Sequence, residues 1–133
     1  MMRGTNMPRI LIVFVALVLG IHGLIHLLGA TVYLKLGDVQ GLAYKTTVLG
    51  GRVDLGAGGI RVFGALWILP AIGFVAAALG LLEGWNWWSV ALLAATVVST
   101  LLTVLDWNVA FMGAIVDFAI VAAVLWFRLR APS

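Results

Sequence analysis

Four long apolar runs, separated by shorter polar stretches, form the main pattern of the chain. The runs cover residues 10–33, 60–82, 87–105 and 109–127. A helix needs roughly 20 mostly apolar residues to cross the hydrocarbon core of a bilayer, and each run is close to that length. The pattern therefore predicts an all-α polytopic membrane protein, an antiparallel four-helix transmembrane bundle that forms a single domain over residues 1–133.

The connections between the runs differ in length and predict different structures. Residues 83–86 and 106–108 are short, so the helices that they join should be antiparallel neighbours. The first connection is much longer. Within it, we expect Asp38 to cap a short interfacial helix that ends near Gly50, with Lys45 at the level of the lipid headgroups.

Glycine, proline and small residues predict how the second run behaves. A flexible lead into this run is expected at Gly56, Gly58 and Gly59. Pro70 should kink the helix, because proline has no backbone N–H and its ring collides with the preceding turn. Close approach to a neighbouring helix is expected at two pairs of small residues, Gly73 with Ala77 and Ala76 with Gly80.

The composition excludes several other classes of protein. Hydrophobic residues make up 64% of the chain and charged residues only 10%. A water-soluble domain carries about 25% charged residues, and disorder requires low hydrophobicity with high charge. The absence of cysteine excludes disulfides and thiolate metal sites. The net charge of +3 does not indicate nucleic-acid binding, because no basic cluster with interleaved aromatic residues lies outside the ends of the runs.

The basic residues near the ends of the runs bear on orientation, because such residues mark the membrane–water boundary. Those on the side of the termini are Arg3, Arg9, Arg128 and Arg130. Those on the opposite side are Lys35, Lys45, Arg52 and Arg61. The terminal arginines lie directly beside the runs, and the N-terminal amine adds to them. We therefore expect the termini on the cytoplasmic side of a bacterial or archaeal cell membrane.

Polar and ionisable residues within the runs are the candidate functional residues, because such groups are costly in hydrocarbon and usually face the interior of a bundle. His22 and His26 in the first run are four residues apart and therefore share one face of a helix. The fourth run contributes Asp117. The third run carries a stripe of polar residues at helical spacing, namely Thr96, Ser99, Thr100, Thr103 and Asp106.

These polar groups lie at similar depths. With a rise of about 1.5 Å per residue, His26 lies about 10 Å from the loop-side end of its run, Asp117 about 12 Å and Ser99 about 8 Å. The half of the bundle nearer the termini is almost entirely aliphatic. We therefore expect a cleft that opens toward the first connection. Arg61 lies at its rim, where we expect it to anchor at the lipid headgroups, and the alternative is that it pairs with Asp106 and gates the cleft mouth.

Several kinds of site fit these residues. The imidazoles could hydrogen-bond to side chains of neighbouring helices and do nothing further. They could anchor the polar end of a ligand, or exchange protons with a carboxylate at the same depth. His22, His26 and Asp117 could also supply three ligands to a divalent metal ion, and a single histidine could bind a haem.

The chain also resembles a group of small four-span bacterial membrane proteins that is loosely similar to the DoxX-like family. The residues that carry the resemblance are Gly20, His22, Gly23, His26 and Gly29, the sequence Gly64-Ala65-Leu66-Trp67, and Trp107 with Gly113 and Asp117. Proteins of this group often have asparagine four residues after the glycine of the fourth span, where this chain has Asp117. The resemblance implies the four-helix fold and does not supply a reaction.

These features together predict a small integral membrane binding or accessory subunit. We expect it to hold a quinone, an isoprenoid or a lipid in the cleft, with His22, His26 and Asp117 fixing the polar end of the ligand. Because four spans enclose little volume, we expect a homo-oligomer or a subunit of a larger membrane complex. One alternative is a membrane-embedded oxidoreductase or isomerase that uses a metal, a haem or a proton relay. Another is proton-coupled transport by an oligomer.

Overall fold

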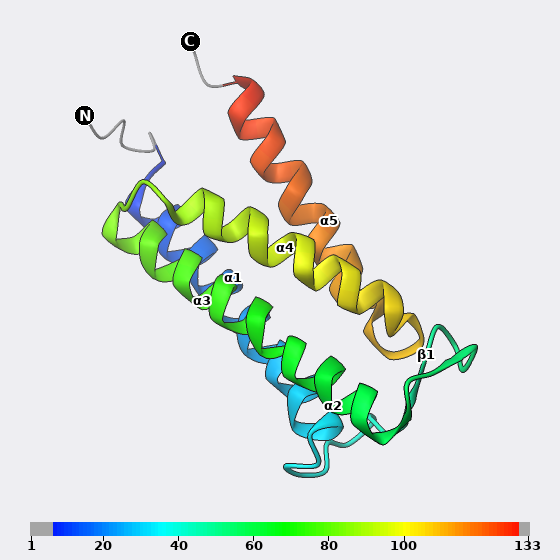
Figure 1. The fold of residues 1–133 in the computed structure, drawn as a ribbon. Helices are drawn as coiled ribbons and strands as arrows, with labels where there is room; N and C mark the ends of the chain where they lie inside the picture. Colours follow the sequence, from blue (N-terminus) through cyan, green and yellow to red (C-terminus); the bar gives the residue numbers. More distant parts are fainter. Residues whose placement is uncertain (1–6, 131–133) are drawn as a thin grey trace.

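The computed structural model describes residues 7–130, which are mostly helical, with a non-helical first connection that contains one short hairpin (Figure 1). The helices are α1 (Arg9–Tyr33), α2 (Gly56–Leu66), α3 (Ile68–Glu83), α4 (Trp88–Leu105) and α5 (Trp107–Arg130). The strands are β1 (Thr47–Val48) and β2 (Val53–Asp54). Arg3 and the side chain of Arg128, which entered the orientation prediction, lie outside the described residues.

Four helical segments of the described chain are long and apolar enough to cross a membrane, with α2 and α3 together forming the second. The segments run alternately in opposite directions, so that the first turn of α1 and the last turn of α5 lie at the same end (Figure 1). α1 packs against α3, α3 against α4, and α4 against α5. The predicted all-α architecture with four membrane-length helices is confirmed.

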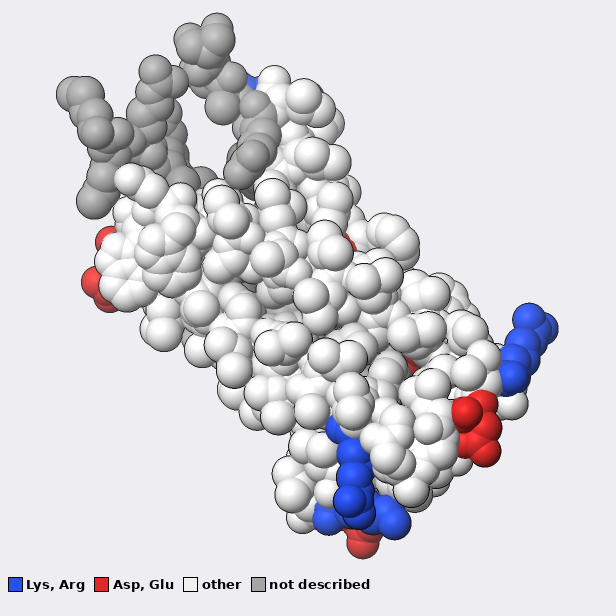
Figure 2. Space-filling model, in the orientation of Figure 1, with Lys and Arg blue, Asp and Glu red and all other residues white. Residues whose placement is uncertain are grey.

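Charged side chains gather toward the two ends of the molecule. On the face seen in Figure 2, most lysine, arginine, aspartate and glutamate side chains lie near the ends, and the surface between them is almost free of charge. The exposed residues of the long helices are mainly large hydrophobic ones, such as Ile21, Val62 and Phe118. This distribution is the one expected of a surface that meets hydrocarbon in its middle and water at its ends.

Small residues allow the helices to approach closely. A Cβ atom added to Gly73 of α3 would lie 2.7 Å from the Cβ of Ala95 in α4, which is too close for two carbon atoms. At Gly23 of α1, an added Cβ would lie 2.9 Å from the Cβ of Phe74 in α3. The predicted close approach at Gly73 is therefore observed, and α3 is the central helix, packed between α1 and α4.

Two apolar clusters fill the bundle at different depths. The terminal-side cluster consists of Ala16, Leu19, Phe74, Ala77, Ala78, Leu81, Leu92 and Ala95. The loop-side cluster consists of Ala30, Val32, Tyr33, Val48, Ile60, Phe63, Trp67 and Leu102. The polar residues of α1, His22 and His26, fall between the two clusters along the helix.

The second membrane-length segment is interrupted at Trp67. The Trp67 N–H bonds to the carbonyl of Gly64, three residues earlier, at 3.2 Å, in place of an α-helical bond. Pro70 explains the interruption, because it cannot donate to the carbonyl of Leu66 and its ring would collide with that carbonyl. The expected distortion therefore takes the form of a break one turn before the proline.

The first connection contains no helix between Asp38 and Gly50, so the predicted interfacial helix is wrong. The connection instead forms the antiparallel β1–β2 hairpin, in which Thr47 pairs with Asp54 and Val48 with Val53. The sequence contains physical reasons for this outcome. β-branched residues in β1 favour extended backbone, and Gly50 and Gly51 adopt φ values of 66° and 86°, which interrupt a helix and allow a turn.

The glycines before the second run are helical, which corrects the prediction of a flexible lead. α2 begins at Gly56, four residues before the predicted start of the run. The Gly56 N–H donates to Oδ1 of Asp54 at 2.9 Å, and this bond satisfies a free donor at the start of the helix. The bond also lowers the pKa of Asp54, with a smaller contribution from the side chain of Thr46.

Candidate functional site

Four of the polar residues singled out in the sequence form one hydrogen-bonded chain across three helices. His22 of α1 donates from Nε2 to Oδ1 of Asp117 in α5 at 3.0 Å. Asp117 Oδ2 lies 2.6 Å from the hydroxyl oxygen of Ser99 in α4, which lies 2.6 Å from Nε2 of His26 in α1. We call these residues the buried polar chain, because the exposed fraction of each is between 0% and 6%.

A further bond within α1 orients His26. Its Nδ1 lies 2.8 Å from the carbonyl oxygen of His22, one turn earlier. Because a carbonyl oxygen only accepts hydrogen bonds, Nδ1 is the donor and carries a proton. His26 is thus held on both sides of its ring, by the backbone of its own helix and by Ser99.

Aromatic rings and apolar clusters surround the buried polar chain. The His22 ring lies 4.8 Å from the His26 ring and 4.7 Å from the Phe74 ring, in edge-to-face arrangements. Trp67 lies 5.5 Å from His26, and its Nε1 is the one buried side-chain donor of the described residues without a hydrogen-bond partner. In such surroundings an unpaired polar atom is costly, so the bonds along the chain are worth more than bonds at a surface.

Two predicted site residues, Thr100 and Thr103, lie outside the buried polar chain. The Thr100 hydroxyl donates to the carbonyl of Thr96, and the Thr103 hydroxyl donates to the carbonyl of Ser99. Each bond stays within α4, as is common for threonine in apolar helices. The polar stripe of the third run is therefore real, and Ser99 is the member that bonds to both α1 and α5.

Asp106 belongs to a second polar cluster, at the loop-side end of the bundle. Its Oδ2 accepts a hydrogen bond from the Tyr33 hydroxyl, and its Oδ1 accepts one from Nζ of Lys45 at 2.5 Å. We call Tyr33, Lys45 and Asp106 the loop-side latch, because Lys45 belongs to the first connection. Nearby, the Leu49 N–H of the hairpin donates to the carbonyl of Leu105 at 2.8 Å.

The latch contradicts the alternative in which Arg61 pairs with Asp106. The Arg61 side chain is exposed, and Lys45 is the cation that reaches the carboxylate. Sequence reasoning missed Lys45 because it placed this lysine on an interfacial helix at the headgroup level. Asp106 itself indicated in the sequence that a cation lies nearby, because a carboxylate at the end of a membrane-length helix requires a counter-charge. It did not identify Lys45 as that cation, because four basic residues lie on the same side.

The predicted three-ligand metal site does not form. His22, His26 and Asp117 are close together, yet the described residues contain no group of three His, Cys, Asp or Glu side chains arranged to hold a metal ion. Both oxygens of Asp117 and both ring nitrogens of His26 are already hydrogen-bonded to protein atoms. The same bonds occupy Nε2 of each histidine, the atom that an axial haem ligand would normally present.

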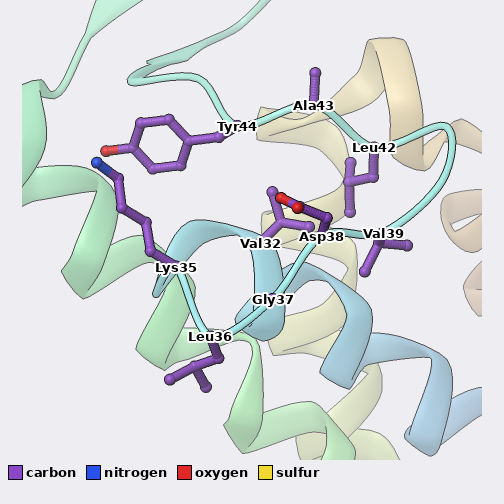
Figure 3. A pocket seen from close by; sticks show the side chains of 9 residues that line it. All are labelled: Val32, Lys35, Leu36, Gly37, Asp38, Val39, Leu42, Ala43 and Tyr44. Atoms are coloured by element: carbon purple, nitrogen blue, oxygen red, sulfur yellow. The ribbon is translucent and has the colours of Figure 1, made fainter.

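A pocket of about 510 Å³ lies at the loop-side end of α1 (Figure 3). It is lined by Val32, Lys35, Leu36, Gly37, Asp38, Val39, Leu42, Ala43 and Tyr44. The Lys35 ammonium lies 4.4 Å from the centre of the Tyr44 ring, and Figure 3 shows the Lys35 side chain extending toward that ring. The pocket is on the side where a cleft was predicted, but none of the buried polar chain lines it.

The backbone at Lys35 is strained. Its φ of 56° lies in the left-handed region, which costs a non-glycine residue about 1–2 kcal/mol. Lys35 follows the last turn of α1, where its N–H bonds to Val32 and the N–H of Leu36 bonds to Thr31. This is the hydrogen-bond pattern of a Schellman motif, and its left-handed position is normally occupied by glycine. A lysine at this position is an outlier that lies on the wall of the pocket.

No protein-family model, curated protein or solved structure matches this chain. The resemblance to DoxX-like proteins therefore stays a prediction, and the function has to be inferred from the residues of the chain itself.

Proposed function

We propose that this chain is a small integral membrane protein that binds an amphipathic lipid at the loop-side pocket. The observation that carries the proposal is the pocket itself. It brings an ammonium group, a carboxylate and a phenol together with aliphatic side chains at the end of a membrane-length helix. Its volume is within the range of about 300–1,000 Å³ that is typical of small-molecule sites.

The outer face of α1 leads into this pocket. Ile21, Ile25 and Leu28 are 59%, 54% and 45% exposed on α1, and the pocket begins one turn beyond Leu28, where Val32 and then Lys35 line its wall. An acyl or isoprenoid chain lying along this stripe would bring its polar end to Lys35. The stripe therefore supplies an apolar path, and the pocket supplies polar partners where the hydrocarbon meets water.

The charges of the pocket favour a zwitterionic phospholipid over a quinone. Lys35 can bind a phosphate through a charge-assisted hydrogen bond, and Asp38 can bind the amine of the same headgroup. A quinone or an isoprenoid alcohol has no cationic group for Asp38. Within this proposal, His22, His26 and Asp117 do not fix the polar end of the ligand, because they bind one another and lie away from the pocket wall.

The test uses the full chain purified in detergent, with native mass spectrometry and organic extraction to identify retained phosphatidylethanolamine or quinone. Lys35→Asn removes the cation while keeping a residue that tolerates the left-handed conformation. We expect retention of the phospholipid to fall roughly tenfold or more, because a hydrogen bond to a charged group is worth about 1.5–3 kcal/mol. Folding should be unaffected.

Arg52→Asn is the matched control. Arg52 is an exposed cation in the turn of the hairpin, on the same side of the molecule, and it does not line the pocket. Phospholipid retention should be unchanged in this variant. Equal losses in both variants would contradict the proposal, since they would show attraction to surface charge alone. A quinone in the extract, unaffected by Lys35→Asn, would contradict it as well.

A further inference from the structure

The proton positions in the buried polar chain follow from which of its atoms can accept hydrogen bonds. His26 Nδ1 carries a proton, because it faces the carbonyl oxygen of His22. On the other side of the ring, Nε2 faces Ser99 Oγ, and Ser99 Oγ faces Asp117 Oδ2. The serine hydroxyl has a single proton and can donate in only one of these two directions.

The first arrangement has the serine donating to Asp117. Nε2 of His26 must then be protonated to bond to Ser99 Oγ. His26 carries protons on both nitrogens and is an imidazolium, while Asp117 is a carboxylate. The result is an ion pair bridged by the serine hydroxyl.

The second arrangement has the serine donating to Nε2 of His26. Asp117 Oδ2 must then be protonated to bond to Ser99 Oγ, so that both end groups are neutral. A carboxylate with a neutral His26 fits neither arrangement, because one of the two contacts of 2.6 Å would join two acceptors with no proton between them.

We infer that the buried polar chain is an intramembrane proton-transfer site, in which one proton moves between His26 and Asp117 through Ser99. The Nε2 proton passes to Ser99 Oγ as the hydroxyl proton passes to Asp117 Oδ2. The Nε2–H bond and the original hydroxyl O–H bond break, and a new hydroxyl O–H bond and the Oδ2–H bond form. No electron is transferred, and the three groups carry zero net charge before and after.

The surroundings of the buried polar chain favour transfer of a proton within it over the gain or loss of a proton by the chain as a whole. His22 on α1 donates to Asp117 Oδ1 in both arrangements, and the other facing groups are the rings of Phe74 on α3 and of Trp67 at the α2–α3 break. Both arrangements keep every hydrogen bond of the chain. Adding or removing a proton would instead leave a net charge in an apolar environment. The site uses none of the pocket residues and is independent of lipid binding.

The test is solid-state ¹⁵N NMR of histidine-labelled protein in phosphatidylcholine bilayers. In the native sequence, the His26 Nε2 signal should lie between the protonated and unprotonated positions and shift with temperature, while Nδ1 stays protonated. In Asp117→Asn the amide is a fixed donor toward Ser99, so the hydroxyl must donate to His26. The Nε2 signal should then move fully to the unprotonated position and lose its temperature dependence.

Thr103→Val is the matched control, because it removes a buried hydroxyl of the same helix that bonds only to backbone carbonyls. It should leave both histidine signals unchanged. A native Nε2 signal identical to that of Asp117→Asn would place the proton permanently on Asp117, and a fully protonated signal at all temperatures would show a permanent ion pair. Either result overturns the inference.

Infrared spectroscopy of the native protein keeps the inference testable without any variant. A protonated-carboxyl band should grow as the protonated Nε2 signal falls with temperature. A band of constant intensity, or no such band at any temperature, would overturn the transfer.

Discussion

Two buried aspartates of this chain each form hydrogen bonds at both carboxyl oxygens, yet their partners differ in kind. Asp117 is 0% exposed and meets a histidine and a serine. Asp106 is 2% exposed and meets a tyrosine and Lys45, whose side chain is 28% exposed. The lysine charge is therefore partly hydrated while it neutralises Asp106.

The comparison shows how depth changes the way a carboxylate is neutralised. At the loop-side latch, a long lysine side chain keeps part of its surface in contact with water and carries a permanent counter-charge. In the centre of the bundle no lysine or arginine of residues 7–130 pairs with Asp117, and its neutralisation depends on where a shared proton lies. The predictions that follow test whether the two aspartates really differ in this way, from the largest expected effect to the smallest.

Two substitutions of Asp117 should separate the contribution of its hydrogen bonds to stability from the contribution of its charge. Asp117→Leu leaves the His22 N–H without a partner and leaves Ser99 bonded to His26 alone, at about 1–3 kcal/mol of unfolding free energy for the stranded N–H. Asp117→Asn keeps an acceptor for His22 and a donor for Ser99, so it should cost much less. Unfolding by denaturing detergent, followed by circular dichroism, measures both. Equal losses would show that Asp117 is held by its charge, as Asp106 is.

Lys45→Met should destabilise the loop-side end, because it leaves Asp106 buried with Tyr33 as its remaining partner. We expect a loss of about 1–3 kcal/mol and faster proteolysis of the first connection. Arg61→Met, at the residue considered as an alternative partner of Asp106, should stay within about 0.5 kcal/mol. A larger effect for Arg61 than for Lys45 would contradict the latch.

Lys35→Gly should raise stability while it weakens lipid retention. Glycine relieves the left-handed strain at the end of α1, and after its own entropic cost a gain of about 1 kcal/mol remains. Thermal unfolding and phospholipid extraction on the same sample measure the two effects. A destabilised variant would contradict this prediction, because it would mean that contacts of the Lys35 side chain within the protein offset the strain.

Asp54 should make the stability of the start of α2 depend slightly on pH in the acid range. The bond from Gly56 lowers its pKa, so the stabilisation is fully present above the ordinary pKa of aspartate and is lost as the pH falls through the lowered value. Amide exchange at Gly56 should accelerate over that window. Asp54→Asn should abolish the dependence, and an unchanged profile in that variant would contradict the assignment.

Much of the fold could be predicted from the apolar runs, but the first connection could not. The start of α1 and the end of α4 fall within a residue of the predicted positions, because length and hydropathy are properties of the chain itself. The prediction of an interfacial helix was wrong because it gave more weight to the helical spacing of Val39 and Leu42 than to the glycines at 41, 50 and 51, which favour turns. In a short segment, a few positive φ values outweigh periodicity.

The candidate site divides in the same way. Spacing and depth placed His22, His26, Ser99 and Asp117 in one layer, and the structure joins these residues. Spacing did not show that the hydrogen-bonding groups of these residues would be occupied by one another, without an arrangement of three metal ligands. Nor did it show that the pocket would form from the loop at the end of α1.

The sequence by itself determined that four helices should be long and apolar enough to span a membrane, and which polar groups would share a depth between them. A helix has a fixed rise and period, so these properties follow from position along the chain. Only the tertiary structure decided which cation reaches Asp106 and which atoms around Ser99 face each other. Those choices depend on the path of the loop and on the rotation of α1, α4 and α5 about their axes. The rotations of α1 and α4 are set by packing against α3 at residues such as Gly23 and Gly73, a close fit that hydropathy and spacing do not specify.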